Sequence, residues 1–481
     1  MTFGDLWRAY ETSFLIVGPV LLVGIALMGI RMSSYWWSFL LFWNRYRERT
    51  AVTTEQLREV AVPNIKIQIT TRGSAGSSEV ILRGIRNVVN LADEDPEFYG
   101  SFMSVEIVTE SQDQAALMER TFSRAAVKVS ALVLPSAYST PNETKLKARG
   151  LHYATVRRRE GWNFVPGKTF IVHYDEESVM TPDELRKLVL VLASTDKKIL
   201  EGPIYYPLEY TDAAVICRGM EANRPVGCFE CRHVMEKGMP LHLHGSNLVV
   251  EEQFENQLGW DIGTLDGQPL IAEDYVFGMS AFLLGGSQAF GWHGCVMLEQ
   301  PPFSVKSAYK QRHRWVTGVL QGMAKARATA EFKQLPRRVR ARLVWGTRFR
   351  IATFALGVVV GLPSVLFLPL LLLRSVQILL INNEPPLPDL MMVGLAAIGA
   401  MWLGSILIGA WYNVIDAGLS WPRRWAEIFA AVAIAPVAGI IESAAGFRAV
   451  QQWVLGSRKV SWQPTPKTKA ADAEIDWRSA A

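Results

Sequence analysis

Three short polar segments bring together carboxylate, guanidinium and indole side chains. They are D-E-E at 175–177, E-D at 273–274 and Q-R-H-R-W at 311–315. One chemistry that uses all of these groups is the transfer of a sugar from a nucleotide diphosphate to a hydroxyl group, which needs a divalent metal and basic side chains that neutralise the leaving diphosphate. It also needs a carboxylate that takes the proton of the acceptor hydroxyl. The three segments together offer each of these groups.

The acidic residues divide into metal ligands and a base. Asp175 and Glu177 end an apolar run and offer carboxylate oxygens, the ligands that Mg²⁺ and Mn²⁺ favour. Asp274, with Glu273 beside it, opens an apolar helical pattern and is our candidate for the general base. Acidic residues are also common in exposed turns and at helix N-termini, so neither segment identifies catalysis when taken alone.

The Q-x-x-R-W segment suits the phosphate side of the same chemistry. Arg314 offers a guanidinium for phosphate, Trp315 offers a flat stacking face, and Gln311 opens the motif. The same segment fits a basic helix at a membrane surface, with Tyr309, Lys310 and Arg312 facing lipid headgroups. Both interpretations can hold for a site beside a bilayer.

These segments need a scaffold, and residues 60–300 predict one of the α/β class. Strand patterns at 65–69, 105–108, 131–134 and 169–173 alternate with helical patterns at 79–91, 114–122, 144–156 and 182–192. Such alternation predicts a mostly parallel sheet with right-handed crossovers, in which ligands bind at the carboxyl ends of the strands. Asp175 follows the fourth strand, where a ligand-binding acid is expected. The other candidates for donor binding are Thr71, Arg72, Gly73, Glu110, Lys147 and Arg149.

Apolar segments at both ends predict membrane contact. Residues 14–30 approach the ~20 residues that a bilayer needs, and the basic residues after them put the N-terminus outside. Residues 35–46 predict a helix lying in the interface. Further apolar runs lie at 351–373, 391–411 and 428–441. The last run is short and holds Pro436 and Glu442, so it predicts a span or a re-entrant segment, and the tail after residue 464 is predicted to be disordered.

Composition narrows the class of protein. The 481 residues are 49% hydrophobic with a net charge of +5, and the basic residues cluster beside apolar segments. This pattern fits a cytoplasmic membrane surface and argues against a nucleic-acid partner. Cys228 and Cys231 form a C-x-x-C without a second pair, which predicts reduced cysteines rather than zinc. His242 and His244 flank an apolar strand-like segment at 241–250 and lack further ligands.

The motifs together resemble a known family. The segments T-R-G (71–73), V-E-I-V-T-E (105–110) and K-A-R-G-L (147–151) precede the acidic pairs and Q-x-x-R-W. Over residues 65–318 the chain resembles the egghead-type β-1,4-mannosyltransferases, a branch of the membrane-bound family 2 glycosyltransferases. The resemblance implies a GT-A-like (Rossmann-like) α/β domain in the cytoplasm, N-terminal and C-terminal transmembrane helices, and inversion by a single displacement.

The resemblance also implies roles and partners. Asp175 and Glu177 would hold Mg²⁺ or Mn²⁺, Asp274 would be the base, and Gln311, Arg314 and Trp315 would bind the diphosphate and acceptor side. Two positions depart from the family pattern: Glu110 stands where Asp is usual, and L-H-G-S at 243–246 replaces K-G-S. The implied domains are an anchor (1–33), an interfacial helix (34–60), the transferase (61–318), basic helices (319–350), transmembrane helices (351–447) and a tail (448–481).

The sequence thus predicts a multi-pass cell-membrane enzyme that moves mannose from GDP-mannose to a glycan or glycolipid acceptor. Transfer from UDP-glucose or UDP-N-acetylglucosamine, including processive polymer synthesis, is the closest alternative. A membrane scaffold without turnover and a transporter are alternatives of other classes. The acids at 175, 177 and 274 argue against the scaffold, and four predicted spans are few for a carrier.

Overall fold

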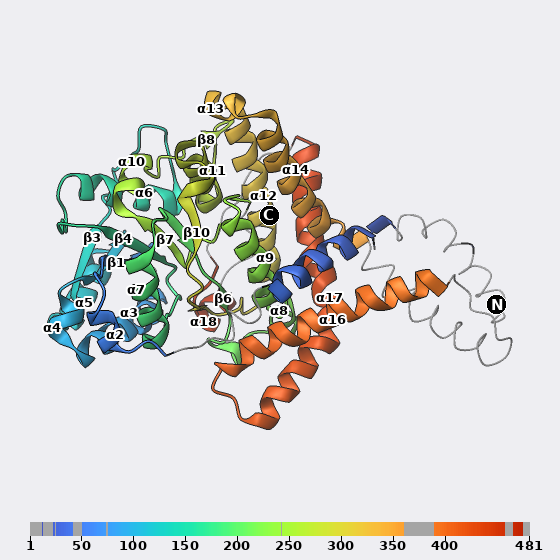
Figure 1. The fold of residues 1–481 in the computed structure, drawn as a ribbon, viewed down its shortest axis with the longest axis horizontal. Coiled ribbons are helices and arrows are strands. Elements are labelled where there is room, and N and C mark those ends of the chain that lie inside the picture. Colours follow the sequence, from blue (N-terminus) through green and yellow to red (C-terminus); the bar gives the residue numbers. More distant parts are fainter. Residues whose placement is uncertain are drawn as a thin grey trace.

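The computed structural model describes residues 12, 23–24, 26–41, 51–73, 76–241, 243–359, 389–456 and 465–474. Within these ranges lies a seven-stranded sheet with the order β10-β5-β7-β4-β1-β2-β3 (Figure 1). Its strands are β1 (Asn64–Thr70), β2 (Met103–Thr109), β3 (Lys128–Val133), β4 (Thr169–Tyr174), β5 (Ile199–Glu201), β7 (Leu248–Glu251) and β10 (Phe290–Trp292).

The sheet is mixed. Strands β1, β2, β3 and β4 pair in parallel, as do β5 and β10, whereas β7 runs antiparallel to both β4 and β5. The four predicted strands are therefore confirmed, and the prediction of a mostly parallel sheet misses the reversal at β7. The strand-like segment 241–250 was also predicted too long, because only Leu248–Glu251 pairs with neighbours.

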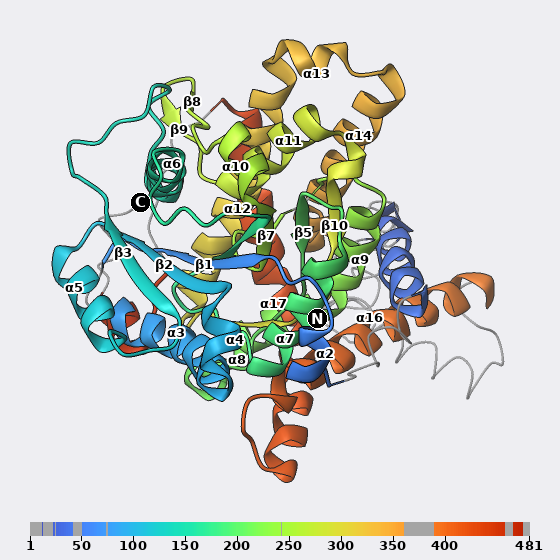
Figure 2. The same cartoon turned by 60° about the vertical axis from the view of Figure 1, so that its left-hand side comes forward.

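Helices cover both faces of this sheet, as Figure 2 shows. Helices α3 (Ser77–Glu94), α5 (Gln112–Thr121) and α7 (Pro182–Ser194) pack on one face, and α6 (Leu146–Arg159) packs on the other. Capping side chains fix where two of them begin, because the hydroxyls of Ser111 and Thr181 accept backbone N–H bonds in the first turns of α5 and α7. All four predicted helices of this region are confirmed.

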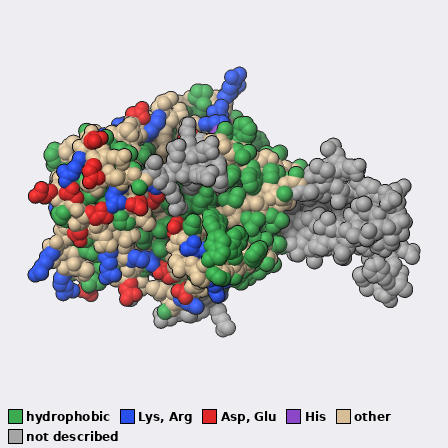
Figure 3. All heavy atoms as spheres, turned by 60° about the horizontal axis from the view of Figure 1, so that its bottom comes forward, with side chains coloured by type: hydrophobic (Ala, Val, Ile, Leu, Met, Phe, Trp, Pro, Cys, Tyr) green, Lys and Arg blue, Asp and Glu red, His purple; other side chains and the backbone are tan. Residues whose placement is uncertain are grey.

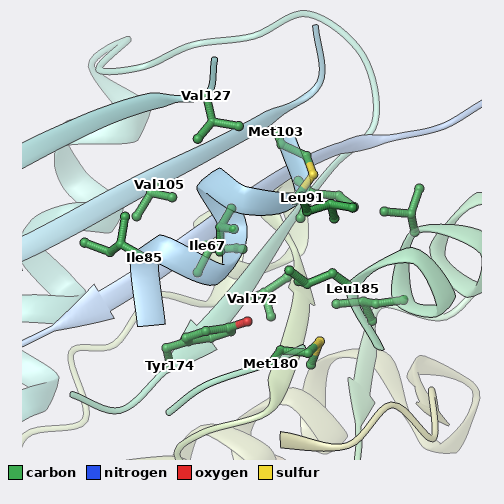
Figure 4. Close-up of a cluster of buried hydrophobic side chains, with 14 of the residues drawn as sticks. Ile67, Ile85, Leu91, Met103, Val105, Val127, Val172, Tyr174, Met180 and Leu185 are labelled. Atoms are coloured by element: carbon green, nitrogen blue, oxygen red, sulfur yellow. The ribbon is translucent and has the colours of Figure 1, made fainter. Parts of the chain in front are cut away.

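The main core lies between the sheet and helices α3 and α7 (Figure 4). Ile67 on β1 and Val172 on β4 meet Ile85 of α3 and Leu185 of α7, and all four are at most 1% exposed. Burying a side chain of this size contributes about 1.5–3 kcal/mol to folding. This core holds the carboxyl ends of the strands in fixed positions.

A second group of helices follows the sheet domain. The long helices are α12 (Val305–Ala328), α14 (Arg337–Ala355), α16 (Asp389–Ile415) and α17 (Trp421–Val454). Helix α17 packs against α12, α14 and α16. The remaining elements are α2 (Thr54–Arg58), α4 (Pro96–Gly100), β6 (Ile204–Tyr205), η1 (Tyr210–Asp212), α8 (Val215–Glu221), α9 (Arg224–Glu236), α10 (Glu252–Leu258), β8 (Thr264–Leu265), β9 (Gln268–Pro269), α11 (Glu273–Gly285), η2 (Ser287–Ala289), β11 (Met297–Leu298), α13 (Ala330–Gln334) and α18 (Lys469–Glu474).

Two described helices are long and apolar enough to cross a membrane by length and composition, at Ala397–Ile415 and Trp421–Val454. The second helix, α17, is 34 residues long and continues through Pro436. The prediction of a short last apolar segment was therefore wrong. Figure 3 shows hydrophobic side chains gathered on one part of the surface and charged ones gathered on another. Large apolar side chains that α17 leaves exposed include Trp421, Phe429, Val437 and Phe447.

The predicted N-terminal features fall largely outside the described residues. Residues 26–41 form one continuous helix, so the described parts of the predicted span and of the predicted interfacial helix join. This helix packs on α9 through Phe39 and Phe229, and Arg31 donates to the Thr353 hydroxyl at 2.7 Å. Most of the predicted span at 351–373 and the residue His242 also lie outside the described residues.

Candidate active site

One cavity of about 970 Å³ collects most of the predicted site residues. The end at the carboxyl edge of the sheet, where the sequence predicts donor binding and which we call the donor end, is lined by Thr71, Arg72, Glu110, Lys147 and Asp175. The cavity then passes the acidic pair of α11 and the Q-x-x-R-W segment of α12. Its lining also includes Glu177, Glu273, Asp274, Gln311, Arg314 and Trp315. Segments more than 200 residues apart in sequence therefore share one space.

Asp175 lies directly after β4, at the carboxyl edge of the sheet. Its backbone N–H donates to the Ser178 hydroxyl at 3.0 Å, and its carboxylate forms an ion pair with Lys147. Although burial opposes ionisation, Lys147 and then Lys467 lower the pKa of Asp175, so the residue stays a carboxylate. Lys147 is the second residue of α6, and the first, Leu146, has a φ of 61°, which is unusual for a side-chain-bearing residue. The turn that aims Lys147 into the cavity is thus a strained one.

Glu177 is buried and forms an ion pair with Lys467, a partner the sequence did not indicate. Lys467 belongs to residues 465–474, which include the short helix α18 (Figure 1). The backbone carbonyl of Lys467 accepts from Gln300 at 3.0 Å, and the Thr465 hydroxyl lies 3.5 Å from Arg314. The prediction of a disordered tail was wrong for these residues, because ion pairing and hydrogen bonding hold them against the site.

Glu299 is a second site residue that the sequence analysis missed. It lines the cavity after the short strand β11, and it accepts from the Ser178 hydroxyl at 3.1 Å and from Ser246. Burial and the nearby carboxylates of Glu177 and Asp175 raise the pKa of Glu299 to about 8. The available signal was its position after an apolar strand, the same position that marked Asp175.

Glu273 and Asp274 form the first turn of α11, as predicted. Burial and the neighbouring Glu273 raise the pKa of Asp274 to about 7. A side chain at Gly245 would point between these acids and Lys147, since its Cβ would lie 3.5 Å from Asp274 Oδ2 and 3.4 Å from Lys147 Nζ. The missing side chain at Gly245 therefore leaves open the space that these groups face.

Arg314 is the residue of α12 that faces the acids. Its guanidinium lies in the electrostatic field of Glu273, Asp175, Asp274 and Glu177. One guanidinium thus faces both the predicted metal ligands and the predicted base.

Two guanidinium groups lie over the ring of Trp315, those of Arg224 at 4.6 Å and Arg312 at 4.4 Å from its centre. Arg312 is fully buried and pairs with Glu221 and with Glu442 of α17 at 3.1 Å. The interpretation in which Arg312 faces lipid headgroups is therefore wrong. The two arginines, held by these ion pairs, contact the ring of Trp315, which lines the cavity.

The nucleoside candidates surround the ends of β1 and β2. The Thr71 hydroxyl donates to Glu176 and accepts from the Gly73 backbone N–H at 3.0 Å. Gly73 has a φ of 77° and does not line the cavity. Glu110 does line it, and Arg149 binds Glu110 at 2.8 Å without lining the cavity itself. Gly73 and Arg149 thus contact lining residues of this end without lining the cavity themselves.

The end of the cavity among the long helices has a mostly apolar lining, with Arg31 and Glu442 among its charged residues. We call it the helix-side end, and it is lined by Met28, Met32, Ile398, Gly399, Trp402, Gly439 and Ile440. These residues come from the N-terminal helix, α16 and α17. The cavity therefore joins a charged end at the sheet with an apolar end among the long helices.

No group of three or more His, Cys, Asp or Glu side chains with metal-binding geometry occurs among the described residues. The four cysteines are free and buried.

Comparisons with known proteins identify the family of the chain. Residues 170–412 match the model of the glycosyl transferase family group 2. The chain is 25% identical over 283 residues to the β-1,4-mannosyltransferase egh of Drosophila melanogaster, covering 58% of this chain and 57% of that protein. It is 26% identical over 195 residues to the β-1,4-mannosyltransferase bre-3 of Caenorhabditis elegans, covering 40% of this chain and 41% of that one. The chain thus spans about half the length of these curated relatives.

Among solved structures, the chain is similar to the mannosyltransferase PcManGT from Pyrobaculum calidifontis, determined in complex with GDP-Man and Mn²⁺. The TM-score is 0.43 at 14% identity, and the match covers 85% of this chain and 98% of that one.

Proposed function

Because the chain belongs to the glycosyl transferase family group 2, we propose that it transfers mannose from GDP-mannose to a lipid-linked or growing glycan. The transfer would invert the anomeric carbon and take place at the cytoplasmic face of a membrane. The single observation that carries this proposal is the cavity that joins paired acids and lysines at the sheet to an apolar end among long helices.

The donor end suits a nucleotide diphosphate. Lys147, Lys467 and Arg314 bring three positive charges to the space in front of Asp175 and Glu177. These cations would exchange part of their carboxylate contacts for phosphate oxygens when the donor enters, because charge-assisted bonds to phosphate are among the strongest that side chains make. Thr71, Arg72 and Glu110 would then face the nucleoside.

Asp175 and Glu177 would hold a divalent metal. Their fit to such an ion is supported by the crowding of buried acid groups, which is strong enough to raise the pKa of Glu299 to about 8. Carboxylate oxygens are the ligands that Mg²⁺ and Mn²⁺ prefer. When bound, the metal would neutralise charge that builds on the leaving diphosphate.

Asp274 would act as the base. The acceptor oxygen forms a bond to the anomeric carbon while the bond from that carbon to the diphosphate oxygen breaks, and the acceptor proton passes to Asp274. A pKa of about 7 suits this role, since a base works best near the pH of its surroundings. The neighbouring carboxylate of Glu273 helps to raise this pKa of Asp274. The open space at Gly245 leaves room for the reacting groups.

The helix-side end favours an acceptor with an apolar part. Met28, Met32 and Trp402 line it, and two helices beside it are apolar enough to span a bilayer. A hydrocarbon chain that enters there gains about 0.8 kcal/mol for each buried CH₂ group. A glycolipid lying in the membrane would thus present its sugar hydroxyl toward Asp274.

A donor panel tests this proposal. The purified full chain is incubated with Mn²⁺ or Mg²⁺, membrane lipid extract and GDP-mannose, UDP-glucose or UDP-N-acetylglucosamine in turn, and products are read by mass analysis. One hexose added from GDP-mannose to a lipid is the expected result. Transfer from a UDP-sugar alone would assign the donor differently, and a ladder of added sugars would make the enzyme processive.

A further inference from the structure

Helix α17 has two unlike faces along its whole length. One face is buried and built from small residues at most 2% exposed: Ala431, Ala435, Ala438, Ala445 and Ala449. The opposite face, which we call the outer face, carries large apolar side chains that are 37–76% exposed: Trp421, Trp425, Phe429, Phe447 and Val454. Both sets recur at helical spacing, so each forms a continuous stripe.

Polar contacts fasten the buried face to helices of the transferase domain. Near the start of α17, Glu427 forms an ion pair with Arg218 of α8 at 2.7 Å. Near its end, the amide oxygen of Gln452 lies 2.7 Å from His313 Nε2 on α12. About 38 Å of helix separates Glu427 from Gln452, since each residue adds about 1.5 Å. Helix α17 therefore follows the domain over a length greater than the ~30 Å of a bilayer's hydrocarbon core.

Crossing the bilayer would carry these polar partners with it. Helix α12 packs against α17 and includes Lys306, Lys310 and Lys325, and such charges are costly within hydrocarbon. Helix α16 differs, because residues 390–415 contain no Asp, Glu, Lys or Arg, and the helix extends away from the sheet domain (Figure 1). Composition does not separate the two helices, but their contacts do.

We propose that α17 lies along the membrane surface instead of crossing it, with its outer face in the headgroup region of an anionic bilayer. This inference builds on the membrane location in the proposed function. Tryptophan is common at such interfaces, and basic residues favour anionic lipids. Glu427 is shared by Arg218 and Arg423, which leaves one positive charge over, and Arg448 is exposed near the other end. A helix that lies in the interface binds through these two kinds of contact.

This orientation also places the cavity beside the lipid. Pro436, Ile440 and Ser443 line the cavity, and their spacing continues the stripe that runs from Phe429 to Phe447. The middle of the outer face is thus a wall of the helix-side end. An acceptor lipid would reach this end sideways, from within one leaflet.

Depth measurements test the orientation. Phe429→Cys, Val437→Cys and Phe447→Cys each replace a side chain that is at least 42% exposed, so the variants should fold. Each is spin-labelled in the full chain, in vesicles of phosphatidylcholine and phosphatidylglycerol, with the wild-type chain and its four buried cysteines as the labelling background. The three labels should lie at one shallow depth, within the ~5 Å radius of a helix. A Val437 label about 12 Å deeper than the other two would show a spanning helix and overturn the proposal.

A control site and a separate assay keep the outcomes distinct. Phe164→Cys replaces a 73% exposed phenylalanine of the transferase domain and should report water. Labels on α17 as accessible to a water-soluble relaxation agent as the Phe164 label would overturn the lipid contact. Flotation of the wild-type protein with the vesicles tests the membrane location of the proposed function. Its failure is therefore distinguishable from a wrong orientation of α17.

The lipid composition tests the charge of the surface. In vesicles of phosphatidylcholine alone, the labels at Phe429 and Phe447 should become up to about fivefold more accessible to the water-soluble agent, because the basic residues beside them lose their anionic partners. The Phe164 label should not change. Equal accessibility in both kinds of vesicle would overturn the preference for an anionic bilayer.

Discussion

The two ends of the cavity are built in different ways. At the donor end each carboxylate has a specific partner, as in the ion pairs of Asp175 with Lys147 and of Glu177 with Lys467. At the helix-side end the lining is mostly apolar, and side chains such as Met32 and Trp402 offer non-directional van der Waals contacts instead of ion pairs. Under the proposed function, the donor end would select its ligand by charge and geometry, whereas the helix-side end would select by apolar volume. Substitutions at the two ends should therefore have different effects on activity.

The largest effect on activity is expected from a substitution at Asp274, between the two ends of the cavity. Asp274→Asn keeps the size of the side chain and removes the base, so kcat should fall by about 10²–10⁴-fold while the donor still binds. Glu273→Gln is the matched control on the same helical turn and should lose much less activity. Transfer rate and donor affinity, measured separately, check this. Normal turnover in Asp274→Asn would move the role of base to another residue.

The pH dependence follows from the same group. Burial and Glu273 raise the pKa of Asp274 to about 7, and the base acts only when deprotonated, so activity should rise with pH through that value. The rate at about pH 5.5 should be about thirtyfold below the rate at about pH 8. Measuring kcat/KM across this range checks the sign. A profile that falls as pH rises would contradict the assignment, and Glu273→Gln should shift the midpoint down, because a neighbouring negative charge is removed.

Loss of a donor-end cation should have a smaller effect. Lys467→Ala removes one charge-assisted contact, worth about 1.5–3 kcal/mol, so the donor KM should rise by about tenfold or more. Lys469→Ala is the matched control, since Lys469 is exposed and two residues away. Measuring the donor KM of both variants shows whether the loss is specific to Lys467. An unchanged KM in Lys467→Ala would mean that the lysine does not contribute to donor binding, and a lower KM would mean that it competes with the donor.

The sequence predicted the donor end better than the rest of the site. Asp175 follows a buried strand, so its position at the sheet edge was readable from strand alternation alone. The place of Lys467 at the site could not be predicted from the sequence, because its contact with Glu177 joins residues 290 positions apart and leaves no periodic signal. Arg312 was misjudged for a similar reason, since its partners Glu221 and Glu442 lie on other helices. Local patterns therefore identified the strands and acids, and the long-range ion pairs needed the fold.

The smallest effect is expected from filling the helix-side end. Gly439 lines the cavity, and a Cβ there would meet no atom within 4 Å, so Gly439→Leu should fold normally and occupy acceptor space. The acceptor KM should rise by about threefold to tenfold for long-chain lipids, which lose a few buried CH₂ groups, and less for short-chain ones. Val437→Leu is the matched control, because Val437 is 42% exposed on the same helix. Donor KM should stay constant in both variants, since the two ends select independently. A change in donor KM that equals the change in acceptor KM would show instead that the ends are coupled.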